Sequence, residues 1–145
     1  MQRKELREKK LALKTRSEWI QDVQKVFNEF IRLRDNKLGC ISCGVPFMSS
    51  AVGGSYDAGH YQSRGAKPHL RFVENNVAGQ CKRCNRYLSG NVANFRTGLI
   101  ARIGIEAVEA LESDNAPRHY TIDDLKSLKS LYQTKIKELE RAKCR

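Results

Sequence analysis

The chain has 145 residues and 40% apolar residues, which suits one domain and excludes disorder throughout. No apolar run approaches the roughly 20 residues of a membrane span, and the N-terminus lacks the apolar segment of a secretory signal. We therefore expect a cytoplasmic protein with no membrane partner. The 27 Lys and Arg outnumber the 16 Asp and Glu, and the formal charge of +11 predicts a polyanionic partner, above all nucleic acid.

The N-terminal part of the chain predicts a basic arm followed by an amphipathic helix. Residues 1–16 carry seven Lys or Arg against two Glu and show little apolar periodicity, so we expect an arm that is at most a frayed helix. Thr15 and Glu18 have the spacing of a capping box. From Trp19 onward apolar residues recur at steps of three and four, which predicts a helix over 17–38 with one face toward the core.

Four of the five cysteines form two C-x2-C pairs, Cys40 with Cys43 and Cys81 with Cys84. Without an export signal we expect a reducing compartment, so disulfides explain these pairs poorly. Two such pairs are typical of a structural zinc ion held by four thiolates, although redox chemistry or chance gives the same spacing. The 37 residues between the pairs exceed the gap of a simple zinc ribbon and leave room for a functional insert. Cys144 is expected to be a free thiol.

The remaining chain predicts a zinc-bound core over 39–90 and a helical region over 91–145, within one domain that spans 17–145. Residues 39–90 lose the helical period, Gly53-Gly54 predicts a turn, and residues 56–61 predict a strand.

Three helices are expected in the helical region. The first follows Asn91 and ends at Gly104, a short one covers 106–112, and the last begins at Thr121 and carries a long apolar stripe.

The insert between the cysteine pairs contains Asp57, His60 and Asn76, and Asn85 directly follows the last cysteine. Because zinc would tether both ends of the insert, Asn85 is expected to lie close to the strand that carries His60. Oxygen ligands from Asp57 and Asn85 suit Mg²⁺ or Mn²⁺, and a neutral His can deprotonate a water molecule.

Basic residues surround these groups and are predicted to contact DNA: Arg64, Lys67, Arg71, Lys82, Arg83 and Arg86. Taken singly, each polar residue has a structural explanation, such as a satisfied histidine, a turn or a solvated face. His69 and His119 are assigned that structural explanation.

The combination of the two cysteine pairs with His60, Asn76 and Asn85 resembles the HNH, or ββα-metal, nucleases. The phage endonuclease VII resolvases are similar at this site as well. Most HNH sequences have a metal-binding Asp directly before the His, whereas this chain has Gly59 there. Asp57 shares a strand face with that position and is expected to replace the usual ligand.

Further motifs resemble the NinG (Rap) recombination proteins of lambdoid phages over about residues 9–140, among them Asp57-Ala-Gly-His-Tyr61, Cys84-Asn85 and Ser89-Gly-Asn91. Members of that family have a longer N-terminal region with its own cysteines, so this chain is either a shorter variant or a trimmed form. The resemblance implies a structure-specific endonuclease that acts on branched recombination intermediates such as Holliday junctions and D-loops.

We therefore expect an α+β fold with a zinc-stapled, HNH-like ββα-metal core flanked by long α-helices. His60 would be the general base, Asn76 would hold the loop that orients it, and Asp57 with Asn85 would bind the catalytic Mg²⁺ or Mn²⁺. The zinc would be structural, because a closed tetrahedral site has no open position for chemistry.

Two alternative interpretations remain from the sequence. The chain is a non-catalytic zinc module that binds branched DNA, or it is a coiled-coil scaffold built on the terminal helices. Basicity alone does not distinguish DNA from RNA. A homodimer is also predicted, because a Holliday junction needs two symmetric nicks and the helical stripes of 17–35 and 121–141 offer apolar surface. The alternative for those stripes is that the two helices pack on each other within one chain.

Overall fold

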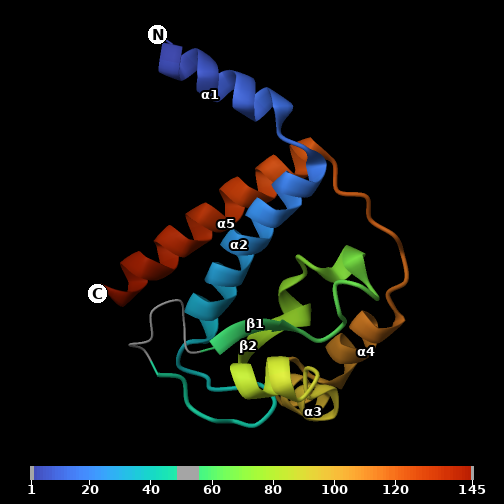
Figure 1. Cartoon of the computed structure of the whole chain (residues 1–145). Coiled ribbons are helices and arrows are strands. Elements are labelled where there is room, and N and C mark those ends of the chain that lie inside the picture. The colour runs from blue at the N-terminus through green and yellow to red at the C-terminus, as the bar shows by residue number, and fades with distance from the viewer. Residues whose placement is uncertain (1, 49–55, 145) are drawn as a thin grey trace.

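The computed structural model describes residues 2–48 and 56–144 as an α+β fold with one small sheet (Figure 1). The predicted turn at Gly53-Gly54 lies outside these residues. The elements in chain order are α1 (Gln2–Leu13), α2 (Arg16–Asp35), β1 (Tyr56–His60), the short helical turns η1 (Pro68–Leu70) and η2 (Glu74–Asn76), β2 (Val77–Cys81), the five-residue π-helical turn η3 (Arg83–Tyr87), α3 (Val92–Ile103), α4 (Ile105–Ser113) and α5 (Ile122–Lys143).

Helices α2 and α5 begin at predicted capping residues, whereas Asn91 precedes α3 without a capping hydrogen bond from its side chain. The side chain of Thr15 accepts a hydrogen bond from the backbone N–H of Glu18 and so caps α2. Thr121 and Asp124 form a reciprocal capping box at the start of α5. Gly104, with φ +90°, separates α3 from α4 because this left-handed conformation favours glycine.

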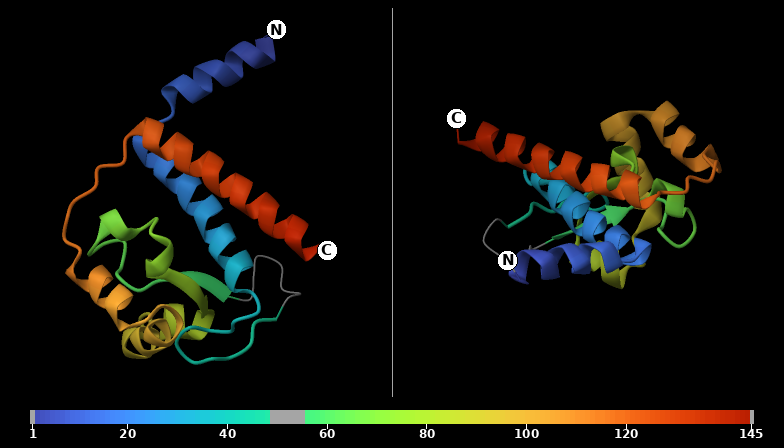
Figure 2. Two further views of the ribbon diagram at one scale, coloured as in Figure 1. Left: turned by 180° about the vertical axis from the view of Figure 1, so that it is seen from behind. Right: turned by 90° about the horizontal axis from the view of Figure 1, so that it is seen from above.

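The long helices α2 and α5 run side by side and pack through their apolar stripes (Figures 1 and 2). Phe27 is fully buried between them and makes an edge-to-face contact with Tyr132 at 4.8 Å between ring centroids. The two helices therefore cover each other within one chain. This packing removes the surplus apolar surface on which the homodimer was predicted, and the dimer itself stays a prediction.

The sheet consists of β1 and β2 in antiparallel register, with Tyr56 opposite Cys81 and His60 opposite Val77. The sequence predicted β1 but not β2. One face of the sheet packs through Ala58 and Val77 on the core between α2 and α5, and Ala78 joins a second core with α3 and α4. Both sheet faces are thus covered, and β2 ends at Cys81, the first cysteine of the second pair.

A buried carboxylate connects α2 to the sheet and to α3. Asp35 is 0% exposed; it accepts a 2.8 Å hydrogen bond from the backbone N–H of Gly79 and forms ion pairs with Arg34 and Arg102. Buried charges need such partners because burial alone strongly disfavours ionisation. Asp35 therefore fixes the sheet, and the site on it, against the helical frame.

The predicted basic arm is the helix α1, which contains no buried residue and extends away from the rest of the chain (Figure 1). Lys14, which directly follows α1, forms an ion pair with Asp22 of α2, and its Nζ lies 3.9 Å from the ring centroid of Trp19. Within residues 2–48 and 56–144, no helix is both long and apolar enough to cross a membrane.

Candidate metal centre and adjoining polar pocket

The two cysteine pairs meet at one point of the fold. The sulfur atoms of Cys40, Cys43, Cys81 and Cys84 all lie within 4.8 Å of one another. The Sγ atoms of Cys43 and Cys81 are 3.8 Å apart, close to the ~3.8 Å edge of a tetrahedron whose Zn–S bonds are about 2.3 Å. The four cysteines are close enough to bind a metal ion, consistent with structural zinc.

Backbone turns hold each cysteine pair in place. The N–H of Cys40 donates to the carbonyl of Val45, and the N–H of Gly44 donates to Cys40, both at 2.9 Å. Gly44 has φ +77°, which lets the chain turn back directly after Cys43. In the second pair, the N–H of Cys84 points at the sulfur of Cys81 at 3.4 Å. The sulfur positions are thus set by local structure and not by chance proximity.

The ionisation of the thiols also favours a cation at this point. Burial opposes ionisation of Cys40, but backbone N–H groups of Cys43, Cys81 and Ser42 together lower its pKa to about 7. For Cys81, burial and the neighbouring sulfurs raise the pKa to about 12. Metal binding needs thiolates, and a bound metal ion would compensate the negative charge that Cys40 and Cys81 carry in this state.

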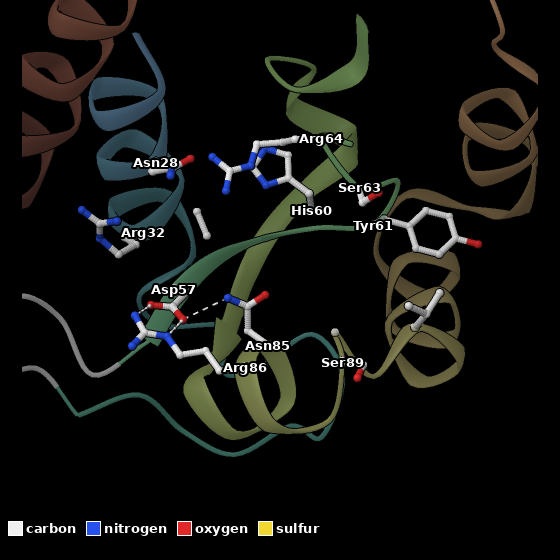
Figure 3. A pocket seen from close by; sticks show the side chains of 13 residues that line it. Asn28, Arg32, Asp57, His60, Tyr61, Ser63, Arg64, Asn85, Arg86 and Ser89 are labelled. Carbon is white, nitrogen blue, oxygen red and sulfur yellow. Dashed lines mark hydrogen bonds and ion pairs between the residues drawn. The ribbon is translucent and has the colours of Figure 1, made fainter. Parts of the chain in front are cut away.

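A polar pocket of about 410 Å³ lies beside the metal centre along the unpaired edge of β1 (Figure 3). Strand β1, the segment after it, η3 and α2 all contribute to its wall. Its polar side chains are those of Asn28, Arg32, Asp57, His60, Tyr61, Ser63, Arg64, Asn85, Arg86 and Ser89. The structure therefore brings five of the predicted site residues into one cavity: Asp57, His60, Arg64, Asn85 and Arg86.

Asp57 and Asn85 touch directly, as the sequence predicted. The amide Nδ2 of Asn85 donates to Oδ2 of Asp57 at 2.9 Å, and Arg86 donates to both carboxylate oxygens at 2.9 and 3.1 Å (Figure 3). Asn85 and Arg86 reach β1 because η3 follows the second cysteine pair immediately. Two neighbouring side chains of η3 are thereby joined to one carboxylate of β1.

His60 ends β1 and faces the same pocket with its ring held by a backbone carbonyl. Its Nε2 lies 3.0 Å from the carbonyl oxygen of Arg71, so in the neutral ring Nε2 carries the hydrogen and Nδ1 is the acceptor. Burial, followed by the positive charges of Arg64 and Arg71, lowers the pKa of His60 to about 4. At neutral pH the imidazole is therefore uncharged and able to accept a proton.

Asn76 lies outside the pocket and holds the loop that follows His60. It is 0% exposed; its Oδ1 accepts from the N–H of Gln62 at 2.8 Å, and its Nδ2 donates to the carbonyls of Gln62 and Leu70. These bonds tie both ends of the loop together, and Arg71 directly after it carries the carbonyl that bonds His60. The structure thus places Asn76 on the loop that it was predicted to hold, and its role in a reaction stays a prediction.

Helix α2 supplies a second wall that sequence reasoning missed. Asn28 and Arg32 line the pocket opposite Asp57, and Asn28 accepts a 2.8 Å hydrogen bond from Gln24. The buried Gln24 in turn accepts from Nε of Arg71 at 3.1 Å, which links α2 to the His60 loop. The available signal was the spacing of Gln24, Asn28 and Arg32 by four, which places them on one helix face.

The other predicted basic residues lie outside the pocket lining. Lys67 donates to the carbonyls of Leu111 and Glu112 at the end of α4. Lys82 and Arg83 lie at the start of η3, where Arg83 is exposed. His69 is buried, and its Nε2 lies 2.7 Å from the carbonyl of Asp114, consistent with a structural histidine.

Comparison with known proteins identifies the family. The family model described as "Bacteriophage Lambda NinG protein" matches residues 1–142. The curated protein "Protein ninG" of Escherichia phage lambda is 46% identical over 138 residues, which are 95% of this chain and 65% of that protein. The protein of the same name from Salmonella phage P22 is 48% identical over 134 residues, 92% of this chain and 64% of that one. No solved structure matches the chain. The chain belongs to the NinG family, and it spans about two thirds of the length of these relatives.

Proposed function

We propose that this NinG-family chain carries a metal-dependent, structure-specific endonuclease site that cuts branched DNA, such as Holliday junctions and D-loops, during phage recombination. The observation that carries the proposal is the pocket along β1. It combines a neutral imidazole, a carboxylate next to a carboxamide, and three guanidinium groups from separate elements, those of Arg32, Arg64 and Arg86. A base, oxygen ligands and a cationic wall are what hydrolysis of a phosphodiester requires.

In this proposal His60 is the general base. Its Nε2–H is held by the Arg71 carbonyl, so Nδ1 takes the proton from the attacking water. Burial is the main reason that the pKa of His60 is lowered, and the positive charges of Arg64 and Arg71, which add to it, also favour an anionic phosphodiester nearby. Asn76 and Gln24 act on His60 through the loop and through Arg71, so they are positioning residues.

The oxygens of Asp57 and Asn85 form a donor set that suits a hard divalent ion such as Mg²⁺ or Mn²⁺. Such an ion would stabilise the charge that develops on the phosphate and on the leaving oxygen. Arg86 holds both oxygens of Asp57, so its guanidinium has to move toward the phosphate when the carboxylate serves a metal.

An HNH-like core is part of the proposal. Strand β1, strand β2 and the helical turn η3 occur in this order along the chain, with η1 and η2 between the strands, and β2 and η3 carry Cys81 and Cys84; this order supports the resemblance. We assign Zn²⁺ to the cysteines as a structural ion because four thiolates leave no open coordination position.

A second candidate is a non-catalytic module that binds branched DNA. The observation that favours it is the bidentate contact of Arg86 with Asp57, which neutralises the one carboxylate among the pocket-lining residues. Under this alternative the pocket binds phosphate and does no chemistry.

Cleavage assays separate the two candidates. The purified protein is incubated with a Holliday junction, a D-loop, a fork and a linear duplex, each with Mg²⁺, Mn²⁺ or EDTA. Nicks at the branched substrates that require the metal and disappear in His60→Ala support the endonuclease. The matched control is His119→Ala, because His119 is exposed and outside the pocket. Tight binding without nicks under every condition supports the binding module.

A further inference from the structure

Three exposed apolar side chains protrude next to the mouth of the pocket. Tyr87, the last residue of η3, is 81% exposed, Leu88 directly after it is 45% exposed, and Val92, the first residue of α3, is 50% exposed. Arg86 and Ser89, which flank the first two, both line the pocket, as does Val92 (Figure 3). Large apolar groups gathered at the edge of a polar cavity are typical of a binding surface.

Hydrogen bonds to η3 and to Gln80 hold the segment that presents Tyr87 and Leu88. The N–H of Leu88 donates to the carbonyl of Arg83, and the N–H of Gly90 donates to the carbonyl of Cys84, so the segment is tied to the metal centre. The buried Gln80 donates to the carbonyl of Gly90 at 2.6 Å. The exposed side chains therefore stand on a fixed support, which lowers the entropy cost of binding.

The positive charge beside Tyr87 and Leu88 indicates which kind of partner binds there. Arg83 and Arg86 lie exposed beside Tyr87, no Asp or Glu occurs between Glu74 and Glu106 in the sequence, and Asp57 of β1 offsets the charge of Arg86 but not that of Arg83. An acidic protein surface would match the positive charge alone, and a purely apolar protein surface would match the exposed apolar side chains alone. A nucleic acid with an unstacked base matches both, because the base offers an apolar face and its phosphates offer negative charge.

We propose that Tyr87 and Leu88 form an apolar wedge that stacks on an unpaired or unstacked nucleobase at the DNA branch point. In a continuous duplex every base face is covered by its neighbours, so the wedge has no surface to contact. A branch exposes base faces next to the phosphodiester that would enter the pocket. The wedge is thus the feature that distinguishes branched from linear DNA. The inference builds on the proposed function by assuming that the pocket takes DNA.

The test is equilibrium binding in a buffer without added Mg²⁺ or Mn²⁺ and without a chelator, so that the proposed cleavage lacks its ion while the cysteines keep their metal. The probes are a Holliday junction with 2-aminopurine at the branch point and a linear duplex of the same length, at one salt concentration. Tyr87→Ala should bind the junction about five- to 150-fold more weakly, the range measured for loss of one base–aromatic stack, and should bind the duplex as the wild type does. The 2-aminopurine fluorescence, quenched by stacking in the wild type, should recover.

Matched variants complete the design. Tyr87→Phe keeps the ring and should restore both affinity and quenching. Leu131→Ala removes an exposed apolar side chain from α5, 46% exposed as against 45% for Leu88, and should change neither. Equal weakening on junction and duplex, or no weakening on the junction, overturns the wedge. If the wild type binds junctions selectively through Tyr87 but never cuts them with Mg²⁺ or Mn²⁺, the endonuclease proposal fails while the wedge stands.

Discussion

His60→Ala should slow the proposed cleavage without weakening DNA binding. Because the pKa of His60 is about 4, only about one imidazole ring in a thousand is protonated at pH 7. Nearly every wild-type molecule therefore has a neutral His60 that can accept a proton. A base whose pKa lies well below the working pH is also a weak one. We therefore expect a loss of about 10²-fold, the lower end of the usual 10²–10⁴ for a general base. The cationic wall formed by Arg32, Arg64 and Arg86 remains in the variant.

The assay is steady-state cleavage of a labelled junction in Mg²⁺ over a range of pH, with binding measured separately in a buffer without Mg²⁺, Mn²⁺ or chelator. In the wild type, kcat/KM should stay flat from pH 8 to about pH 5 and fall as the pH approaches 4. The fall in kcat should come at a higher pH, because a bound phosphate raises the pKa of the neighbouring imidazole. Undiminished cleavage by His60→Ala, or an unaltered pH profile, would remove His60 from the mechanism.

The same pKa predicts an effect on stability that needs no catalysis. The pKa of His60 is lowered in the folded protein from its ordinary 6.5, so between pH 6.5 and pH 4 the unfolded chain takes up the proton first. Stability is retained above pH 6.5 and is lost as the pH falls, by on the order of 3 kcal/mol at pH 4. His60→Ala should show a smaller loss over this window in urea unfolding.

Three other predictions concern the metal centre, the buried carboxylate and the arm. Cys84→Ser should release the metal and unfold the segment over 39–90, because structural zinc contributes on the order of 10 kcal/mol in small modules. Elemental analysis measures the metal, and a metal-free protein with an intact fold contradicts this prediction. Asp35→Ala should lower the free energy of unfolding by about 3–5 kcal/mol in urea titrations, since it leaves Arg34 and Arg102 without their shared partner, and a loss below 1 kcal/mol contradicts it. Deletion of α1 should flatten the dependence of log K for DNA on log salt by about 0.9 for each lost phosphate contact, and an unchanged slope means that α1 does not touch DNA.

The helical frame could be predicted because its signals are local. Thr15 and Thr121 cap their helices through residues three positions away, and Gly104 breaks the chain through its own backbone. The cysteine cluster also followed from spacing alone. These features need no knowledge of distant contacts, since each depends on a few neighbouring residues.

Strand β2 and the α2 wall could not be predicted, because their signals are tertiary. Val77-Ala-Gly-Gln-Cys81 has neither alternation nor a run of large apolar residues, since it is buried on both faces. Its Gly79 is fixed by Asp35, which lies 44 positions earlier. Asn28 and Arg32 join the pocket only through the packing of α2 beside β1.

The departure of Gly59 from the HNH pattern has a steric explanation in the packing of Gln80. A Cβ built on Gly59 would overlap Oε1 of Gln80 and lie 3.1 Å from its Cβ and Cδ. Gln80 is fully buried and cannot swing away freely, because its amide nitrogen donates to Ser42 at 2.9 Å and to Gly90 at 2.6 Å. Gly59 is therefore needed for space, and an acidic ligand at this position would displace the support of the wedge.

Gly59→Ala should accordingly lower the free energy of unfolding by about 1–3 kcal/mol, the usual cost of overpacking. Gly65→Ala is the matched control, because nothing lies within 4 Å of a Cβ there and the change should be neutral or slightly stabilising. In a double-mutant cycle, Gln80→Ala removes the obstructing side chain, so Gly59→Ala should cost much less in that background. Urea unfolding of the four metal-loaded proteins measures the coupling. Strictly additive losses would show that Gln80 is not what excludes a side chain from position 59.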